Sequence, residues 1–157
     1  LCRSTWETLF TCGKVAPVSV SAREMIFMAE PGFGGFMKDH KEFFNALAED
    51  GWRAVAGYVG VEEKILSGRF DHASHAGAVT RLSRWAAGAS VNHPVSHDWC
   101  EEVFLISGTL SIGTAPQESR RLEAGTYAVR PAHVEHGPFF TRDGCLMIEF
   151  LYYPPTV

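Results

Sequence analysis

The sequence predicts an all-β fold, an antiparallel sandwich or barrel, and two observations carry this prediction. From Trp52 onward, short apolar runs alternate with glycine-rich or polar connections. No helical pattern separates these runs, as it would if parallel strands were joined by crossover helices. Many short strands with regular turn signals are typical of sandwiches and barrels.

The individual strands follow from alternation and from the turn residues that bound them. In residues 78–85 the side chains alternate, with Arg81 and Trp85 on the same side of an extended chain. The apolar run after Cys100 predicts a strand that Gly108 closes. Further strands are expected at 109–112, 125–130 and 145–153, with a short strand or turn at 54–61, a charged, partly solvated stretch at 62–66 and a loop at 71–77.

Residues 1–75 are expected to precede the main β region of a single domain that spans 1–157. Residues 1–30 mix isolated apolar residues with Ser, Thr and Gly in no sustained period. Residues 36–50 predict one short helix, and Gly51, which tolerates positive φ, is expected to end it.

Composition narrows the classes of partner. The chain has 14 basic and 18 acidic residues, a net charge of -4 and no block of Lys or Arg. Nucleic acid and anionic membranes are therefore not expected partners, and no apolar run approaches the roughly 18 residues of a membrane span. The four cysteines form no C-x-x-C pair, which favours reduced thiols and a cytoplasmic location.

Possible metal ligands gather in two clusters along the sequence. The first lies just before the strand that Gly108 closes, and the second lies far enough downstream to belong to another strand. Imidazole and carboxylate groups bind Fe, Mn, Zn, Cu or Ni, and two histidines with one carboxylate form the open site of non-haem iron. The clusters are His93, His97, Glu101 and Glu102, and His133, Glu135 and His136.

The spacing within the first cluster resembles the first motif of the cupin superfamily, G-x5-H-x-H-x3-4-E-x6-G. His97, Glu101 and Gly108 match its later part. Val95 stands where the motif has its first histidine, and His93 lies two residues earlier. A shift of two residues keeps the same strand face and moves the donor by roughly 6.5 Å. His93 therefore remains an open candidate for a fourth ligand.

The second cluster resembles the second cupin motif, G-x5-P-x-G-x2-H-x3-N. Gly125, Pro131 and His136 match it, whereas His133 replaces a glycine and Phe140 replaces the final asparagine. His133 is expected in a tight turn that faces solvent or the mouth of the barrel. The two motifs occur in the right order, with sixteen residues between them.

The resemblance implies a fold and a ligand set. The fold is a double-stranded β-helix, the jelly-roll barrel of RmlC-like cupins, with its core at 78–153 and a short helical N-terminal extension. His97, Glu101 and His136 would hold one divalent metal, and they would act in catalysis through that metal. Because cupins often dimerise through exposed strands or terminal arms, and residues 1–30 suit such an arm, a homodimer is expected.

Glu101 is preferred over Glu102 because a slip of one residue would point the carboxylate out of the barrel. The same choice places Val103 and Leu105 on the inner face. Other residues are expected in ordinary structural roles: Cys100 and Cys145 as buried packing residues, Arg81, Arg84 and Arg130 as surface charges or ion pairs, His40, His72 and His75 in solvent, and Trp85, Trp99, Tyr127, Phe139 and Phe140 in the core or lining the barrel.

Three functions are compatible with such a site. The first hypothesis is a metal-dependent dioxygenase, with Fe(II) as the expected metal, acting on a small chelating molecule such as a β-diketone or hydroxyketone. The second is a Zn, Ni or Mn isomerase, lyase or cyclase, with Glu102, Glu135 or His133 as acid or base. The third is a metal- or ligand-sensing cupin without turnover, similar to the zinc-binding anti-sigma cupins.

Overall fold

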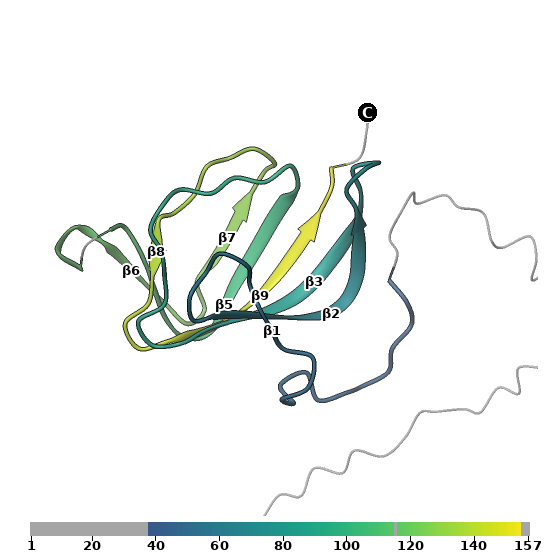
Figure 1. Ribbon diagram of the computed structural model, residues 1–157, viewed down its shortest axis with the longest axis horizontal. Helices are drawn as coiled ribbons and strands as arrows, with labels where there is room; N and C mark the ends of the chain where they lie inside the picture. The colour runs from purple at the N-terminus through teal and green to yellow at the C-terminus, as the bar shows by residue number, and fades with distance from the viewer. Residues whose placement is uncertain (1–37, 115, 155–157) are drawn as a thin grey trace, which may run out of the picture. The chain divides into compact units, whose positions relative to one another are not determined.

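A computed structural model describes residues 38–114 and 116–154 of the chain and confirms the all-β prediction (Figure 1). Within these ranges no helix is long and apolar enough to cross a membrane. The elements are β1 (Arg53–Ala54), β2 (Val61–Asp71), β3 (Ala76–Trp85), β4 (Ser90–Val91), β5 (Cys100–Ile112), the 3-10 helix η1 (Pro116–Glu118), β6 (Arg120–Glu123), β7 (Tyr127–Arg130), β8 (Phe139–Phe140) and β9 (Cys145–Tyr152).

The strands form one curled antiparallel sheet, which is consistent with a cupin jelly roll. Its hydrogen-bonded order is β1-β2-β3-β9-β5-β8-β4, and β6 and β7 also pair with β5. Figure 1 shows β7, β5, β9, β3 and β2 side by side around the curl. The concave face of this sheet is where the functional residues gather.

Strand β5 belongs to both halves of the curl. Residues 100–108 pair with β9, and residues 101–104 also pair with β7. Residues 109–112 instead pair with β6, and the last two of them also pair with β8. The sequence predicted that Gly108 would end the strand, and this was wrong. Gly108 has φ +76°, and the register shifts between Leu105 and Ser107, so the strand bends here instead of stopping.

Strand β2 is longer than the sequence suggested. Residues 54–61 form little strand, because β1 ends at Ala54, whereas the charged stretch 62–66 lies inside the eleven-residue β2. β2 pairs with β3 along its whole length. The sheet therefore begins at Arg53, earlier than the boundary at residue 78 drawn from the sequence.

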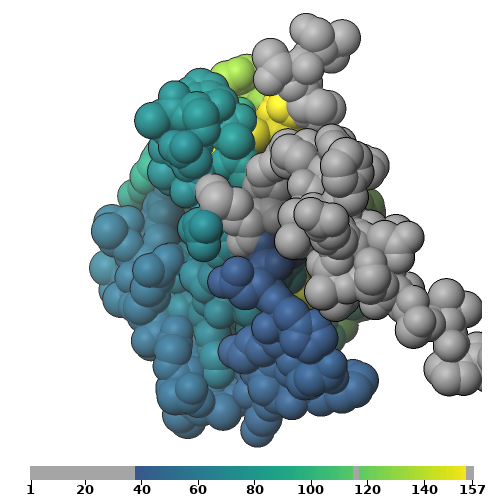
Figure 2. All heavy atoms as spheres, turned by 90° about the vertical axis from the view of Figure 1, so that its right-hand side faces the viewer, coloured from purple at the N-terminus to yellow at the C-terminus, as the bar shows by residue number. Residues whose placement is uncertain are grey.

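The helix predicted at 36–50 is not found in its described part, residues 38–50. Asn45 caps a single turn, accepting a hydrogen bond from the Leu47 amide at 3.0 Å. The carbonyl of Ala48 accepts hydrogen bonds from the side chains of Trp52 and Lys64, at 3.1 Å and 2.8 Å, instead of a helical amide. These contacts tie the turn to β2, and in Figure 2 the dark blue atoms of this segment lie against the lighter blue atoms that follow it. Tertiary contacts outweigh a weak helical pattern here.

The concave face is defined by the register of the central strands. Opposite residues in a sheet share a face, so Arg81, Glu149 and Val103, which lie opposite one another across β3, β9 and β5, point the same way. Val103 and Leu105 are buried in the core, as predicted. Residues between them, such as Phe104, lie on the outer face.

The outer face exposes several large apolar side chains, namely Phe104, Ile106, Tyr127, Val129 and Phe150. The placement of Tyr127 in the core was therefore wrong, whereas Phe139 is buried and Trp85, Trp99 and Phe140 are half-buried. Cys145 is buried, and burial raises the pKa of its thiol to about 12, which fits an unreactive packing residue. Cys100 is only half-buried.

The bend at Gly108 generates a stability prediction. A Cβ on Gly108 would lie 2.2 Å from the Gly144 carbonyl oxygen and 2.7 Å from the Cys145 Cα, whereas a Cβ on Gly125, also at positive φ, would meet nothing within 4 Å. Gly125→Ala should lower the free energy of unfolding by about 1 to 2 kcal/mol through backbone strain alone. Gly108→Ala should lower it by about 3 kcal/mol or more, because backbone must also move. Urea denaturation measures both, and equal losses would contradict a clash at Gly108.

Candidate metal site

Three of the predicted metal ligands lie together on the concave face. One donor atom from each of His97, Glu101 and His136 lies within 4.8 Å of the other two. Glu101 is on β5 and only 6% exposed, His97 precedes that strand, and His136 lies between β7 and β8. We call these three residues the donor triad.

Backbone hydrogen bonds between the two motif segments bring the donor triad together. Val95 and His136 exchange two hydrogen bonds, each of 2.9 Å, as an isolated antiparallel bridge. The amide of His133 donates to the carbonyl of His97 at 2.7 Å. His133 itself has φ +67° and an exposed side chain, as expected for a residue in a tight turn. The fold therefore fixes the two histidine ligands relative to each other.

The surroundings of the two imidazoles suit metal binding. Nδ1 of His136 lies 3.0 Å from the Val134 carbonyl oxygen, which can only accept, so a hydrogen on Nδ1 would orient the ring and leave Nε2 for a metal. That Nε2 lies 3.3 Å from Oε2 of Glu101. Burial lowers the pKa of His97, with further lowering by His136, against the opposing effect of Glu101. The lowered pKa favours the neutral form of His97, which can donate a lone pair.

Arg130 compensates the buried carboxylate of the donor triad. Its Nη1 donates to Oε2 of Glu101 at 2.7 Å, and its guanidinium lies 5.6 Å from the centre of the Phe139 ring. A carboxylate has two oxygens, so Glu101 can keep this ion pair and still offer Oε1 to a cation. Two imidazoles and one carboxylate fit a divalent first-row metal.

The donor triad lines a cavity in the concave face, which we call the triad cavity. Its walls are mostly apolar, and a few charged groups converge on it, which is typical of a small-molecule site. Val95, the residue at the position of the missing motif histidine, is part of the wall. The lining residues are Val55, Tyr58, Val61, Arg81, Ser83, Trp85, Val91, Val95, His97, Glu101, Val103, Leu110, Arg130, His136, Phe139, Met147 and Glu149.

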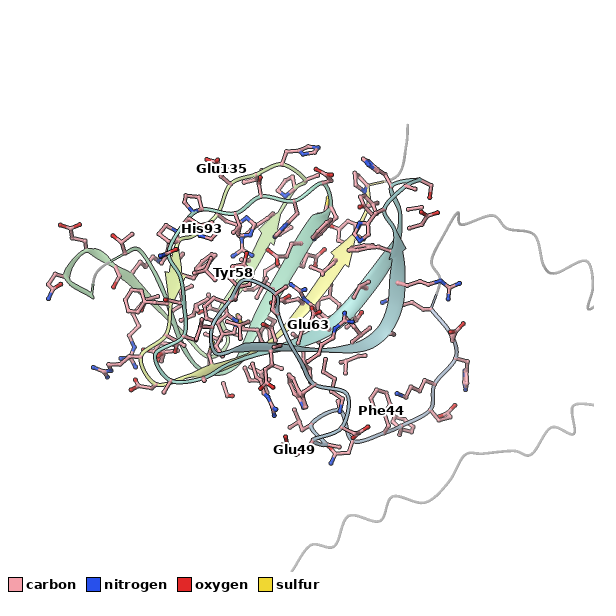
Figure 3. All side chains as sticks on the ribbon, viewed as in Figure 1. Phe44, Glu49, Tyr58, Glu63, His93 and Glu135 are labelled. Carbon is pink, nitrogen blue, oxygen red and sulfur yellow. The ribbon has the colours of Figure 1, made fainter. Side chains whose placement is uncertain are left out.

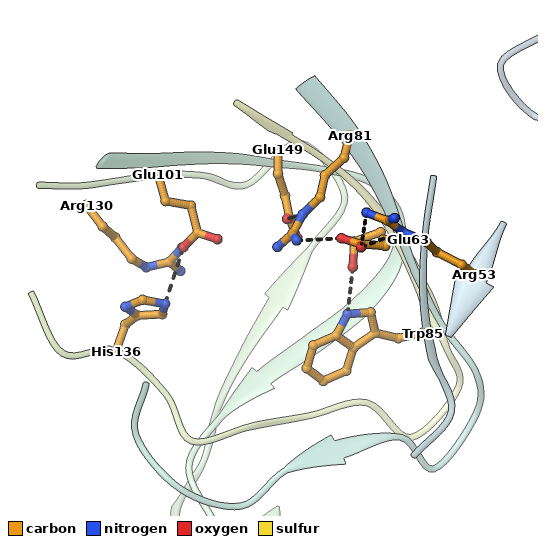
Figure 4. A network of polar contacts seen from close by, with 9 residues as sticks. Arg53, Glu63, Arg81, Trp85, Glu101, Arg130, His136 and Glu149 are labelled. Carbon is orange, nitrogen blue, oxygen red and sulfur yellow. Dashed lines mark hydrogen bonds and ion pairs between the residues drawn. The ribbon is translucent and has the colours of Figure 1, made fainter. Parts of the chain in front are cut away.

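A second group of charges lies beside the donor triad (Figure 4). Arg81 contacts Glu149 through Nε and donates from Nη1 to Glu63 at 2.6 Å, and Glu63 also pairs with Arg53 at 2.9 Å. Burial raises the pKa of Glu149, as do the nearby carboxylates of Glu101 and Glu63, while Arg81 opposes the rise. Burial alone would lower the pKa of Arg81, but Glu149 and Glu63 raise it.

Sequence reasoning missed Glu149 and Glu63. Glu149 lies at an inward position of β9, between the buried Met147 and Leu151, so strict alternation along that strand would have pointed it into the barrel. No such pattern marks Glu63 in the sequence, because the stretch 62–66 around it carries charged residues on both faces of the strand. Arg81 and Arg130 do form ion pairs, but inside the concave face, whereas Arg84 pairs with Glu62 and Glu49 on the outside.

His93 is not brought to the donor triad. It is exposed, its Nδ1 lies 3.2 Å from Oδ1 of Asn92, and its ring lies 6.4 Å from that of Tyr58. Figure 3 shows Tyr58 and His93 near each other. Since Tyr58 lines the triad cavity, this geometry places His93 near its edge rather than among the ligands.

The residues expected as an acid or base do not line the triad cavity. Glu102 faces outward and accepts hydrogen bonds from Tyr127 and Tyr152, at 2.5 Å and 3.0 Å. Glu135 and His133 are exposed, and Glu135 lies on the outside of its loop in Figure 3. Among the described residues, Glu149 is the carboxylate that lines this cavity besides Glu101.

The remaining histidines are exposed, as predicted, although not all are free of contacts. His40 lies 3.0 Å from Glu42 at the surface. Nδ1 of His72 lies 2.8 Å from the hydroxyl of Tyr153, and the ring of His75 stacks on that of Tyr153 at 5.2 Å.

Comparison with known proteins agrees with this fold. Residues 40–152 match the model of the family described as the ChrR cupin-like domain. KdgF from Halomonas sp. shares 20% identity and a TM-score of 0.54, over 74% of this chain and 96% of that one. An RmlC-like cupin from Shewanella frigidimarina shares 18% identity and a TM-score of 0.55, over 76% and 96%.

An acetylacetone dioxygenase from Acinetobacter johnsonii shares 17% identity and a TM-score of 0.54, over 73% of this chain and 76% of that one. None of the curated proteins matches. The structural likenesses establish the fold alone, whereas the family match covers most of the chain. The protein therefore belongs to the cupin superfamily, as a member of the ChrR cupin-like family.

Proposed function

We propose that this protein binds one divalent metal through His97, Glu101 and His136 and, with Fe(II), oxidises a small molecule that chelates through two oxygens. The observation that carries this proposal is the donor triad on the wall of a mostly apolar cavity. Two histidines and one carboxylate are the ligand set of non-haem iron oxygenases. One protein of similar fold is described as an acetylacetone dioxygenase, so β-diketones are the first substrates to test.

The protein's own side chains would prepare the site. A bound Fe(II) would supply Lewis acidity and redox chemistry. The hydrogen bond from His136 Nδ1 to Val134 fixes the ring that presents Nε2, and Arg130 holds the carboxylate of Glu101. Apolar wall residues such as Phe139 and Met147 would exclude water from the substrate.

Glu149 is proposed as the base of the reaction. A β-diketone becomes an enolate when the carbon between its carbonyls loses a proton, and a carboxylate of Glu149 in the cavity wall would accept that proton. Its raised pKa makes it a stronger base than an ordinary glutamate. Arg81 holds it in place.

The same observation supports a second candidate function. A metal-bound carbonyl and a buried base are also what an isomerase or lyase uses, with Zn, Ni or Mn and without O2. The two functions differ in their need for oxygen. The cytoplasmic location and the homodimer remain predictions.

The ligand assignment predicts the effect of four alanine substitutions. Protein stripped of metal should bind about one Zn(II) per chain by isothermal titration calorimetry. His97→Ala, Glu101→Ala and His136→Ala should each weaken binding by more than about 100-fold, because a ligand removed costs more than an outer-shell partner. His93→Ala is the matched control and should bind as the unaltered protein does. Full affinity in His136→Ala would refute the site, and a loss in His93→Ala would establish a fourth ligand.

The pairing of Arg130 with Glu101 predicts a metal-dependent stability. Arg130→Met leaves a buried carboxylate without its cation, which should lower the free energy of unfolding of the metal-free protein by about 3 to 5 kcal/mol. Saturating Zn(II) should restore part of the loss, because the metal then compensates Glu101. Arg121→Met, which removes an exposed pair with Glu123, is the control and should change little. Urea denaturation measures the free energy of unfolding with and without Zn(II). If Zn(II) restores none of the stability that Arg130→Met loses, the idea that a metal compensates the charge of Glu101 is contradicted.

The proposed reaction predicts oxygen consumption. Fe(II)-loaded protein should consume O2 with acetylacetone in an oxygen electrode, and Glu149→Gln should lower the rate by about 100-fold while keeping its metal. Glu63→Gln removes the other carboxylate from Arg81 without altering the triad cavity, so it should retain most of the activity.

NMR would follow the substrate under anaerobic conditions. If the substrate is consumed without O2, the oxygenase proposal is wrong and the isomerase or lyase proposal is supported. Metal binding without turnover of β-diketones or hydroxyketones in either assay would contradict both enzyme proposals and favour a sensor.

A further inference from the structure

A second cavity lies in the same concave face. Its floor is apolar, formed by the buried Val79 of β3 and Leu151 of β9, and its walls include Phe70, His72 and Trp99. None of the donor triad lines it. We call it the indole cavity, after Trp99.

The walls of the indole cavity are aromatic. The ring centres of Phe70 and Trp99 lie 5.2 Å apart, those of Phe70 and His72 lie 5.3 Å apart, and those of His72 and Trp99 lie 5.7 Å apart. Tyr153 supports the group from behind, with its hydroxyl 2.8 Å from Nδ1 of His72. A wall of close rings over an apolar floor favours a flat, conjugated ligand.

Trp99 carries a buried donor with no acceptor. Its Nε1 is enclosed, and no described residue accepts its hydrogen. An indole N–H that is buried usually finds a partner, and each exception calls for an explanation. Because Nε1 is enclosed, an oxygen atom of a ligand would supply the missing acceptor only after the Trp99 ring moves toward the cavity.

The charges around the indole cavity favour an anion. Three arginines and one glutamate line it: Arg53, Arg69, Arg81 and Glu63. Arg53 and Arg81 are both paired with Glu63. Arg69 is exposed and has no ion pair among the described residues, so its guanidinium is available to a carboxylate.

We propose that the indole cavity binds a planar aromatic carboxylate, whose ring lies against Phe70 and Trp99 and whose carboxylate pairs with Arg69. Binding moves the Trp99 ring, so that its Nε1 donates to a second oxygen of the ligand. The site shares Arg81 with the triad cavity but none of the donor triad, and it does not depend on the proposed reaction. It is nonetheless linked to the metal ligands, because the rings of Trp99 and His97 stack at 4.7 Å with 4° between their planes. A ligand that moves Trp99 therefore acts on His97.

The test uses 4-hydroxybenzoate and the full-length, metal-free protein, so that the carboxylate has no metal to bind. The chain has four tryptophans, and the ¹H–¹⁵N signal of the Trp99 indole is assigned by its loss in Trp99→Phe. This signal should shift downfield and saturate as ligand is added. The indole signal of Trp85, which lines the triad cavity, should stay in place.

Matched ligands and variants test each part of the proposal. Arg69→Gln, a surface change that should not disturb folding, should weaken binding by about tenfold, whereas Arg121→Gln on β6 should not change it. Neutral 4-hydroxybenzamide and the non-planar cyclohexanecarboxylate should both bind at least about tenfold more weakly.

His136→Ala tests which cavity holds the ligand. It alters the triad cavity, so binding of 4-hydroxybenzoate in the indole cavity should stay intact. Three results would overturn the proposal: no saturable shift of the Trp99 signal, a shift of Trp85 in its place, or equal binding of the neutral amide.

Discussion

The compensation of buried carboxylates is the constraint on which this structure depends. Glu101 and Glu149 are 6% and 5% exposed on the concave face of an otherwise apolar sheet. An unpaired charge in such a place costs several kcal/mol, so each needs a cation within contact. Arg130 and Arg81 supply these cations from neighbouring strands. The buried carboxylates that give the site its chemistry must therefore also be paired with cations for the fold to be stable.

Strand register decides which side chains take part. Glu101 lies opposite Arg130 across β5 and β7, and a slip of one residue would bring Glu102 inward in its place. The bridge between Val95 and His136 fixes the second motif against the first by backbone hydrogen bonds alone. Side-chain chemistry at this site thus rests on main-chain pairing, which tolerates substitution of the neighbouring side chains such as His133.

The sequence was informative where spacing and alternation act together. His97, Glu101 and His136 could be found because a motif records both their separation and their strand face. Glu149 was missed although alternation along β9 points it inward, because no motif marks its position and its partner Arg81 is distant in sequence. The helix expected at 36–50 failed for a different reason: in its described part, the large apolar side chains of Phe43 and Leu47 stay exposed, so no buried surface rewards a helical face. Gly108 was read as an end although its positive φ bends a continuing strand.

The central claim is that the donor triad holds a metal, and anomalous X-ray scattering tests it most directly. Crystals of the protein loaded with Fe(II) under anaerobic conditions would be measured above and below the iron absorption edge. The account predicts one strong anomalous peak per chain, at about 2.0 to 2.2 Å from a nitrogen of His97, a nitrogen of His136 and an oxygen of Glu101. A peak bound elsewhere, or no peak at the triad in fully loaded protein, would contradict the account.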